Sequence, residues 1–314
     1  MKPKVAVVIP VYNAESTVLD AIASVDQQSY RDLAIIAVDD GSTDNSLALL
    51  RDFAMSRPNV VVLTHGNHGA GYSRNRGIRH AMEREIPFIA FLDADDIWHQ
   101  DKIAWQMRVF ELHPDADLVA VKQERFERRQ EMQERQFNEA LLMKVENLFE
   151  ILCLKDFPFH PASCVARTSV FSEELMYDTR FSCGEDFRPF LYFGFLWLTV
   201  FYIDVALYFE RALPGSLQRQ RCSAYHGYRA RVVAIDEMLG ARGSDTRMTP
   251  PRVSLLLRAR GRYLSGMIYG ARRCLSYPKA LAVAARTFTH YRQRRKFLVE
   301  FTKTVLFPLT RSLR

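Results

Sequence analysis

The chain has 314 residues, of which 48% are apolar and 25% are charged. This is an ordinary globular composition, long enough for one large domain or for one domain with an appendage. Its five cysteines are scattered and form no C-x-x-C pair, so neither a disulfide framework nor a zinc site is predicted. Residues 247–314 hold 16 of the 43 basic residues and one of the 36 acidic residues, so an acidic body precedes a basic tail.

The first apolar run begins four residues into the chain and lacks a convincing small-residue cleavage site. It therefore predicts a strand and not a signal peptide. An odd number of cysteines without pairing motifs fits a reducing compartment. We expect a cytoplasmic protein.

Strands and helices are predicted to alternate over the first hundred residues. Short apolar runs lie at residues 5–11, 33–38, 60–63 and 88–92, which is the length of a strand buried on both faces. Between them, apolar residues recur at helical spacing in residues 16–26, 47–53 and 78–85, with Asn13 and Ser16 as candidate caps of the first helix. This alternation predicts an α/β fold with a mostly parallel central sheet flanked by helices.

Polar or glycine-rich residues follow every one of these predicted strands. They are Tyr12 and Asn13, the residues 39–42, the loop 66–71 and the residues 93–96. In a parallel sheet the carboxyl ends of the strands meet at one edge, where ligands bind. The four segments are therefore expected to converge on one site.

The fourth of these segments contains Asp93, Asp95 and Asp96 directly after an apolar strand. Neighbouring carboxylates repel one another, so such a cluster either lies open to water or holds a cation. Carboxylate oxygens suit Mg²⁺ or Mn²⁺, which keep positions open for water and phosphate. The alternative is an ordinary acidic turn or helix N-terminus.

Two common nucleotide folds do not fit. A dinucleotide-binding fold needs G-x-G-x-x-G directly after the first strand, whereas that turn here is Pro10 to Asn13. A P-loop needs G-x-x-x-x-G-K-S/T, which the sequence lacks.

The sequence instead resembles the inverting family 2 glycosyltransferases of GT-A fold. The resemblance rests on four motifs in the family's order: Val-Ile-Pro-Val-Tyr-Asn at residues 8–13, Val-Asp-Asp-Gly-Ser-Thr-Asp at 38–44, the glycine-containing segment 69–77 and Leu-Asp-Ala-Asp-Asp at 92–96. Together they cover about 100 residues, and four motifs in order are far more specific than one.

The resemblance implies a set of donor-binding residues: Pro10, Tyr12, Asn13, Asp39, Asp40, Gly41, Arg74 and Asp93. Of these, Pro10, Tyr12 and Asp40 are implied to hold the base, usually uracil, with Asp40 accepting from its ring N–H. Arg74 is implied to lie near the base and diphosphate. Asp95, with Asp93, is implied to bind Mn²⁺ or Mg²⁺.

The second half of the predicted domain is less informative. We expect a helix from Trp98 to Leu112, a strand at residues 119–121, and a charged, solvated helix or loop at residues 122–139. Residues 157–167 resemble the strand that lines the acceptor side of such enzymes. Glu185 and Asp186 resemble the family's catalytic pair, with Asp186 as general base and Glu185 second. Taken alone, the pair also fits an ordinary helix N-terminus.

The remaining apolar and basic segments bear on membranes. The run 190–203 is about 14 residues long, below the ~20 residues that cross a bilayer, so we expect a buried helix and then a strand from Leu198 to Tyr208. The loop 210–217 resembles the one that closes over the donor diphosphate. Helical periodicity with many basic residues continues to the C-terminus, which predicts peripheral attachment to an anionic membrane surface.

We therefore expect a GT-A domain over residues 1–220, with nucleotide-sugar binding in 1–100 and the acceptor side in 101–220. A basic helical region is expected over 221–314. The expected activity is metal-dependent, inverting transfer of a sugar, with a UDP-sugar as the expected donor, to a saccharide or lipid-linked acceptor in bacterial-type cell-surface glycan synthesis. The alternatives are a haloacid-dehalogenase-like phosphatase and a non-catalytic nucleotide-sugar binder. No nucleic-acid-binding module is recognised.

Overall fold

The computed structural model describes residues 4–126, 137–155, 157–212, 223–241, 245–274 and residue 283. These residues divide into two compact units. The first comprises the chain up to Arg180 together with Arg188–Leu213, and the second comprises Phe181–Phe187 together with the chain from Pro214 onward.

The first unit is built on a nine-stranded sheet with the strand order β3-β2-β1-β4-β8-β6-β9-β5, and β7 pairs with β9. The strands are β1 (Val5–Val11), β2 (Leu33–Asp39), β3 (Val60–Thr64), β4 (Phe88–Phe91), β5 (Ile97–Trp98), β6 (Leu118–Phe126), β7 (Leu142–Lys144), β8 (Val165–Arg167) and β9 (Val200–Arg211). The helices of this unit are α1 (Val18–Asp26), α2 (Ser46–Ala54), α3 (Ala70–Glu83), α4 (Lys102–Leu112), α5 (Leu148–Leu154) and α6 (Phe187–Phe195), the last of which begins in the second unit.

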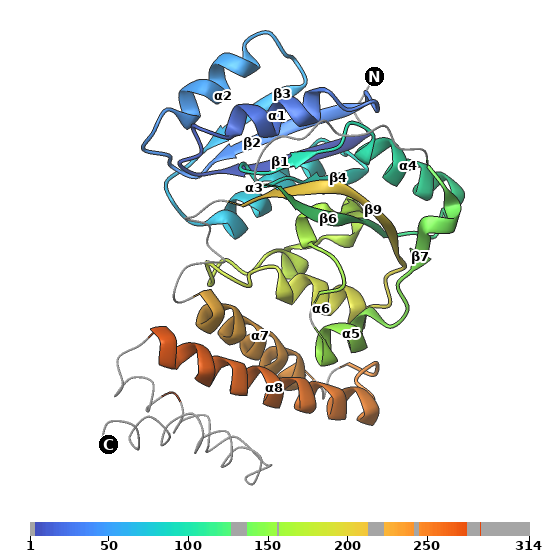
Figure 1. Cartoon of the computed structure of the whole chain (residues 1–314). Coiled ribbons are helices and arrows are strands. Elements are labelled where there is room, and N and C mark those ends of the chain that lie inside the picture. Colours follow the sequence, from blue (N-terminus) through green and yellow to red (C-terminus); the bar gives the residue numbers. More distant parts are fainter. Residues whose placement is uncertain are drawn as a thin grey trace. The chain divides into compact units, whose positions relative to one another are not determined.

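The first four strands confirm the predicted parallel sheet. β1 pairs in parallel with β2 on one side and with β4 on the other, and β2 pairs in parallel with β3. Helix α1 connects β1 to β2, and α2 connects β2 to β3. Because strand-helix-strand connections are right-handed, both helices lie on the same face of the sheet. The connection through α3 returns across β1 to β4 and lies on the other face (Figure 1).

Helix α3 packs unusually close to the sheet at Gly77. A Cβ atom at this position would lie 2.3 Å from the Cγ1 atom of Val8, which is inside van der Waals contact. Only a glycine therefore allows α3 to rest on β1 at this distance.

The chain reverses its direction of travel across the sheet between β1 and β4, which is where ligands bind in open α/β sheets. The pairing of the two strands ends with Val8 and Phe91, and the last ladder bond runs from Leu92 N–H to Val8 O. The next residue of β1 whose N–H would point towards β4 is Pro10, and proline has no N–H to donate. The two strands therefore separate just before Asp93 and Tyr12.

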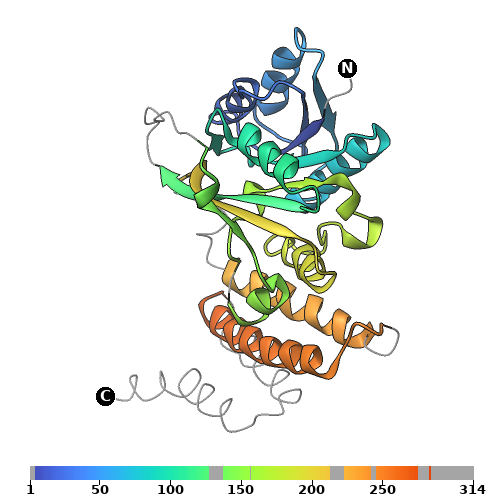
Figure 2. The same cartoon turned by 90° about the vertical axis from the view of Figure 1, so that its right-hand side faces the viewer.

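The rest of the sheet is mixed. β6 and β9 run side by side in parallel (Figure 2), while β8 is antiparallel to both β4 and β6. The predicted strand at 119–121 is confirmed in longer form as β6, and the strand predicted at 198–208 is confirmed as β9, which begins at Val200 and continues to Arg211.

Three local predictions were wrong. Trp98 is not helical, because Ile97–Trp98 forms β5 against Phe209 and Tyr208, and α4 begins only at Lys102. Residues 122–126 are neither a solvated helix nor a loop, because they extend β6 along β9 through a register shift; residues 127–136 lie outside the described part of the chain. Glu210 and Arg211, expected in a loop, end β9.

The second unit contains the helices α7 (Ser223–Gly240) and α8 (Pro250–Cys274), which pack along each other. Small residues allow the close approach: a Cβ atom at Gly266 would lie 2.7 Å from the Tyr228 ring, and one at Gly270 would lie 2.7 Å from Tyr225 N. No helix among the described residues is long and apolar enough to cross a bilayer. The basic tail beyond residue 274 lies outside the described residues, apart from residue 283.

Candidate functional site

The carboxyl ends of β1 and β2 are tied together by their following loops. The turn after β1 donates three successive N–H groups to the loop after β2 and the first residue of α2: Asn13 N to Ser42 Oγ (3.1 Å), Ala14 N to Ser46 Oγ (2.8 Å) and Glu15 N to Asp44 Oδ2 (3.0 Å). These bonds satisfy backbone donors before α1, where side-chain caps were expected. The expected caps were wrong, because Thr17 immediately precedes α1 and no side chain caps it.

Asn13 and Gly41 provide the backbone conformations that this arrangement needs. Asn13 has a φ of 49°, and its Oδ1 accepts from Thr43 N at 2.8 Å. Gly41 has a φ of 72°, and a Cβ atom there would lie 2.9 Å from Asn67 N, so a side chain would clash as well as strain the backbone. Tyr12 stands at the same edge and is 49% exposed, while Pro10 is buried within β1.

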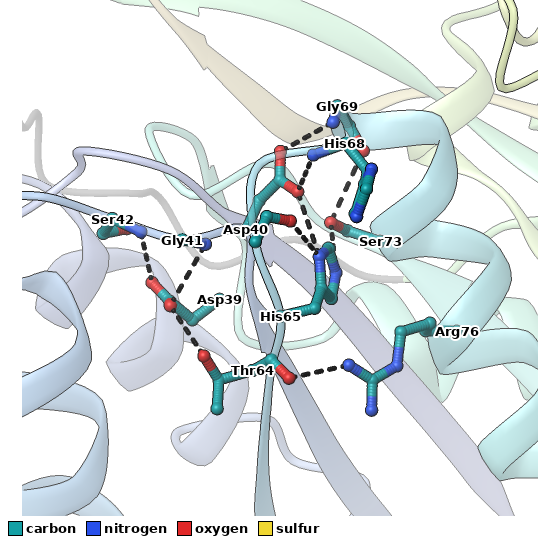
Figure 3. Close-up of polar contacts among 11 residues, drawn as sticks. Asp39, Asp40, Gly41, Ser42, Thr64, His65, His68, Gly69, Ser73 and Arg76 are labelled. Atoms are coloured by element: carbon teal, nitrogen blue, oxygen red, sulfur yellow. Dashed lines mark hydrogen bonds and ion pairs between the residues drawn. The ribbon is translucent and has the colours of Figure 1, made fainter.

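Asp39 and Asp40 are both buried, and their carboxylates serve different loops (Figure 3). Asp39 accepts hydrogen bonds from Gly41 N and Ser42 N, each at 3.3 Å, and from Thr64 Oγ1 at 3.1 Å. It therefore holds its own turn to the end of β3.

Asp40 reaches in the other direction, to the loop that precedes α3. Its Oδ1 accepts from His68 N and its Oδ2 accepts from Gly69 N, both at 2.8 Å. The Nδ1 atom of His65 lies 3.3 Å from the same Oδ1. A carboxylate that accepts backbone N–H groups is a strong positioning group, so Asp40 fixes the entry into α3.

Helix α3 contributes Arg74 and Asn75 to the same edge. Arg74 Nη2 donates to Asp93 Oδ1 at 2.6 Å. Asn75 makes two buried hydrogen bonds of 2.9 Å with the backbone of Tyr177, and the Tyr177 ring lies 5.3 Å from the Arg74 guanidinium. The Asn75 pairing was not predicted, because its partner lies 102 residues away and carries no local motif.

The acidic turn, defined here as residues 93–96, gives its three carboxylates three environments. Burial would raise the pKa of Asp93, but Arg74 and His160 together lower it below its ordinary value. Burial, with the Asp93 charge, raises the pKa of Asp95 to about 6. Burial and the charges of Asp93 and Asp95 raise the pKa of Asp96 to about 8.

Hydrogen bonds from β9 hold the acidic turn in place. Asp96 Oδ2 accepts from Tyr208 Oη at 2.5 Å, and Asp96 Oδ1 accepts from Arg211 N at 2.7 Å. Arg211 also donates from Nε to Asp95 O (2.8 Å) and from Nη2 to Asp20 Oδ2 (2.9 Å). Arg211 was expected in a loop over the donor diphosphate, but its bonds to the acidic turn were not predicted, and neither was the role of Tyr208. Nothing in the local sequence of β9 points to a partner more than 110 residues earlier.

The carboxylate oxygens of the acidic turn are suitable ligands for a divalent cation. The Asp95 carboxylate has no ion-pair partner among the described residues, and its raised pKa measures the cost of its charge there; a nearby cation would relieve that cost. No group of three or more His, Cys, Asp or Glu side chains in the described residues is arranged as a metal site. A cation at Asp95 would therefore complete its shell with phosphate and water, as Mg²⁺ and Mn²⁺ commonly do.

Asp186 and Glu185 lie in the second unit, whereas the predicted donor residues lie in the first. The loop that carries them reaches α7 at a close contact: Gly184 has a φ of 81°, and a Cβ atom there would lie 3.0 Å from the Cα atom of Gly227. Burial and the charges of Glu185 and Asp186 raise the pKa of the neighbouring Cys183 to about 11. The roles of the two acidic residues stay predictions.

Comparisons with known proteins place the sequence among glycosyltransferases. The curated relatives match between 30% and 69% of the chain, which covers only 17% to 41% of their length. One is the Escherichia coli UDP-Glc:alpha-D-GlcNAc-diphosphoundecaprenol beta-1,3-glucosyltransferase WfgD, 37% identical over 33% of this chain and 39% of its own. Another is the putative teichuronic acid biosynthesis glycosyltransferase TuaG of Bacillus subtilis, 37% identical over 34% of this chain and 41% of its own.

Two solved structures resemble the chain over nearly its whole length. Residues 1–349 of S. aureus TarS in complex with UDP-GlcNAc match with a TM-score of 0.63 at 17% identity, covering 93% of this chain and 90% of that one. The mannosyltransferase PcManGT of Pyrobaculum calidifontis, in complex with GDP-Man and Mn²⁺, matches with a TM-score of 0.57 at 17% identity, covering 98% and 88%. These likenesses show the GT-A fold. The family model described as glycosyl transferase family 2 matches residues 6–175, which is more than half of the sequence, and the chain belongs to this family.

Proposed function

We propose that this protein is an inverting glycosyltransferase that transfers a sugar from a nucleotide diphosphate, with a UDP-sugar as donor, to a hydroxyl group of a saccharide or lipid-linked acceptor. The observation that carries the proposal is that Asp40 holds the entry into α3, while Arg74 of the same helix pairs with Asp93 of the acidic turn, which follows the point where β1 and β4 separate. The names of WfgD and TuaG support a role in bacterial cell-surface glycan synthesis. The UDP-GlcNAc complex of TarS supports the choice of UDP.

In this proposal the donor lies along the edge formed by β1, β2 and β4. Tyr12, half-exposed beside buried Pro10, takes the face of the base, and Asp40 accepts its ring N–H. Asn13, Asp39 and Gly41 shape the two loops through the bonds described above. Arg74 is held by Asp93 with its guanidinium near the diphosphate.

Asp95 is the proposed ligand of Mn²⁺ or Mg²⁺, supported by Asp93. When bound, the cation supplies charge neutralisation for the departing nucleotide diphosphate. Arg211 serves the same site indirectly, because its bond to Asp95 O fixes the turn that carries the carboxylate.

Asp186 is the proposed general base, with Glu185 second. It would take the proton of the acceptor hydroxyl as that oxygen attacks the anomeric carbon from the face opposite the leaving group, which inverts the configuration. One carboxylate suffices here because the leaving diphosphate needs no protonation, in contrast to the two carboxylates of a glycosidase. Asp186→Asn should lower turnover by orders of magnitude while UDP affinity is retained, and turnover at the wild-type rate would exclude Asp186 as the base.

The donor site is tested by calorimetric titration of the full chain with UDP, with and without Mn²⁺. We expect binding that needs the metal and that is lost in Asp95→Asn. Asp115→Asn, which changes an exposed aspartate elsewhere, is the matched control and should bind like the wild type. If UDP fails, GDP and dTDP are titrated next, and failure of all three contradicts the proposed donor site.

The two alternatives make different predictions. A haloacid-dehalogenase-like phosphatase carries its D-x-D after the first strand of its core, whereas the acidic turn here follows β4, with three strands before it in the chain. Family membership also disfavours this alternative. A non-catalytic binder would bind the nucleotide sugar with its metal and yet transfer no sugar to any acceptor.

The proposal also assigns a function to each segment of the chain. Donor binding is assigned to residues 1–100, the acceptor side to residues 101–220, and membrane attachment to the basic region 221–314. Each Lys or Arg near an anionic bilayer contributes about 1 kcal/mol. The full chain should therefore float with vesicles that contain anionic lipid, release in high salt, and ignore zwitterionic vesicles; equal behaviour with both vesicle types would remove the membrane claim.

A further inference from the structure

Three contacts surround the carboxylate of Asp40 and leave little of it open. Oδ1 faces His68 N at 2.8 Å and His65 Nδ1 at 3.3 Å, while Oδ2 accepts from Gly69 N at 2.8 Å. A carboxylate has about four acceptor positions, two on each oxygen. Among the described residues, His68 N therefore fills one position on Oδ1, the His65 imidazole stands in the way of the other, and Gly69 N leaves one position open on Oδ2. Asp40 is only 3% exposed, so a ligand can approach it from one side alone.

His65 is the side chain that stands in the way of the second position of Oδ1, and it is held there firmly (Figure 3). Its Nδ1 also lies 2.6 Å from Gly66 O, which places the ring proton on Nδ1. Its Nε2 then accepts from Ser73 Oγ at 3.2 Å, and Ser73 is fully buried in α3. The Tyr72 ring packs edge-on against the imidazole at 4.9 Å. The imidazole therefore cannot turn away from Asp40 without breaking several contacts.

A carboxylate with one open acceptor position selects among nucleobases. Uracil presents one ring N–H between two carbonyl groups, so a single acceptor satisfies it. Guanine presents its ring N–H beside an amino group, and these two donors need two acceptors. Leaving a buried donor without an acceptor weakens binding by about 5-fold to 150-fold.

The geometry points to His65 as a residue that determines donor specificity, by restricting Asp40 to a single N–H and so favouring a uracil over a guanine nucleotide. This inference rests on the proposed function, because it takes Asp40 as the group that meets the base. The comparisons do not decide between a uracil and a guanine nucleotide, since TarS was solved with UDP-GlcNAc and PcManGT with GDP-Man.

The test is the ratio of the dissociation constants for GDP and UDP, measured by calorimetry on the full chain with Mn²⁺. The wild type should prefer UDP by at least 5-fold. His65→Ala opens Oδ1, so the preference should fall at least 3-fold, mainly through tighter binding of GDP. His80→Ala removes another histidine near the end of α3 and should keep the wild-type ratio. Circular dichroism and thermal melting establish folding, and His65→Ser replaces His65→Ala if the latter does not fold.

The outcomes separate this inference from the donor site itself. If the wild type binds UDP with its metal and His65→Ala keeps the wild-type ratio, His65 does not set the preference and the donor site stands. Wild-type binding of GDP as tight as that of UDP also overturns the inference, whatever the variants do. If the wild type binds neither nucleotide, the proposed donor site fails, and the inference fails with it.

Discussion

Asp96 is the carboxylate of the acidic turn whose role is easiest to separate from metal binding. Both of its oxygens are engaged, by Tyr208 Oη at 2.5 Å and by Arg211 N at 2.7 Å, and the residue is only 3% exposed. Its pKa of about 8, raised by burial and by the neighbouring aspartates, means that it carries a proton at neutral pH. A neutral amide of the same shape should therefore replace it, with its oxygen accepting from Arg211 N and its NH2 group donating to the Tyr208 hydroxyl oxygen.

We expect Asp96→Asn to fold and to bind UDP in the presence of Mn²⁺ within about 3-fold of the wild type. Asp96→Ala instead leaves the buried Tyr208 hydroxyl and the Arg211 N–H without their acceptor. Each orphaned group costs about 1–3 kcal/mol, so the free energy of unfolding should fall by about 2–6 kcal/mol. Urea unfolding followed by circular dichroism measures the stability, and calorimetry measures the binding.

Asp95→Asn is the comparison that makes this test decisive. It should lose metal-dependent UDP binding while the metal-free protein becomes at least as stable as the wild type, because the substitution removes a charge whose burial raises the pKa of Asp95 to about 6. Asp96→Ala should instead lower the stability. If Asp96→Asn abolished metal-dependent binding as completely as Asp95→Asn, the charge of Asp96 would be needed at the metal and our reasoning would be refuted.

Asp96→Asn should also change the way in which the stability of the metal-free protein depends on pH. The pKa of Asp96 is higher in the folded protein, at about 8, than the value near 4 expected in the unfolded chain. The folded state therefore binds the proton more tightly, and this group's contribution to stability falls as the pH rises from about 4 to about 8, by at most about 1.4 kcal/mol per pH unit. Asp96→Asn should lack this fall, so its stability relative to the wild type should increase with pH across that range.

Three further predictions concern residues that support the site. Burial lowers the pKa of Lys102 to about 7, so the unfolded chain binds more protons than the folded protein between about pH 7 and 10. The free energy of unfolding should therefore rise with pH in that range, by at most about 1.4 kcal/mol per pH unit. Lys102→Met should unfold at a higher urea concentration than the wild type at pH 7, and this difference should close towards pH 10. Gly77→Ala places a methyl group 2.3 Å from Val8 Cγ1 and should cost about 1–3 kcal/mol in urea unfolding. Asn75→Ala removes both bonds to the Tyr177 backbone and should cost about 2–6 kcal/mol, with weaker UDP binding in calorimetry at temperatures where the variant is folded.

The parallel half of the sheet was predictable because its strands are continuous apolar runs that end in polar residues. Residues 5–11 are buried at every position as β1, and an apolar run without alternation signals just this burial on both faces. Helical periodicity between the runs then fixed the alternation, and the right-handed connection rule placed the helices. The edge at which the polar strand ends meet could also be predicted, because the carboxyl ends of parallel strands lie at one edge of the sheet.

The short strand β5 and the extension of β6 could not be predicted in this way. Both owe their structure to β9, which lies more than 80 residues later in the chain. Trp98 and Ile97 continue the periodicity of the following helix, yet backbone pairing with Tyr208 and Phe209 outweighs it, since propensity is a weak constraint beside tertiary contacts. A charged segment such as 122–126 likewise gives no sign that a partner strand will align with it.

The acidic turn shows why spacing alone could not assign its three carboxylates, although the family resemblance implied Asp95, with Asp93, as the metal ligand. Spacing places Asp93, Asp95 and Asp96 after one strand, and nothing in the spacing says which of them meets a cation. The assignment comes from partners supplied by other elements: α3 brings Arg74 to Asp93, and β9 brings Tyr208 to Asp96. Among the described residues Asp95 is left as the carboxylate of the three to which no other element gives a hydrogen bond or an ion pair, in a setting that raises the pKa of its carboxyl group. A divalent cation would recover the free energy that this charge costs in the metal-free protein, which is why we propose Asp95 as the metal ligand.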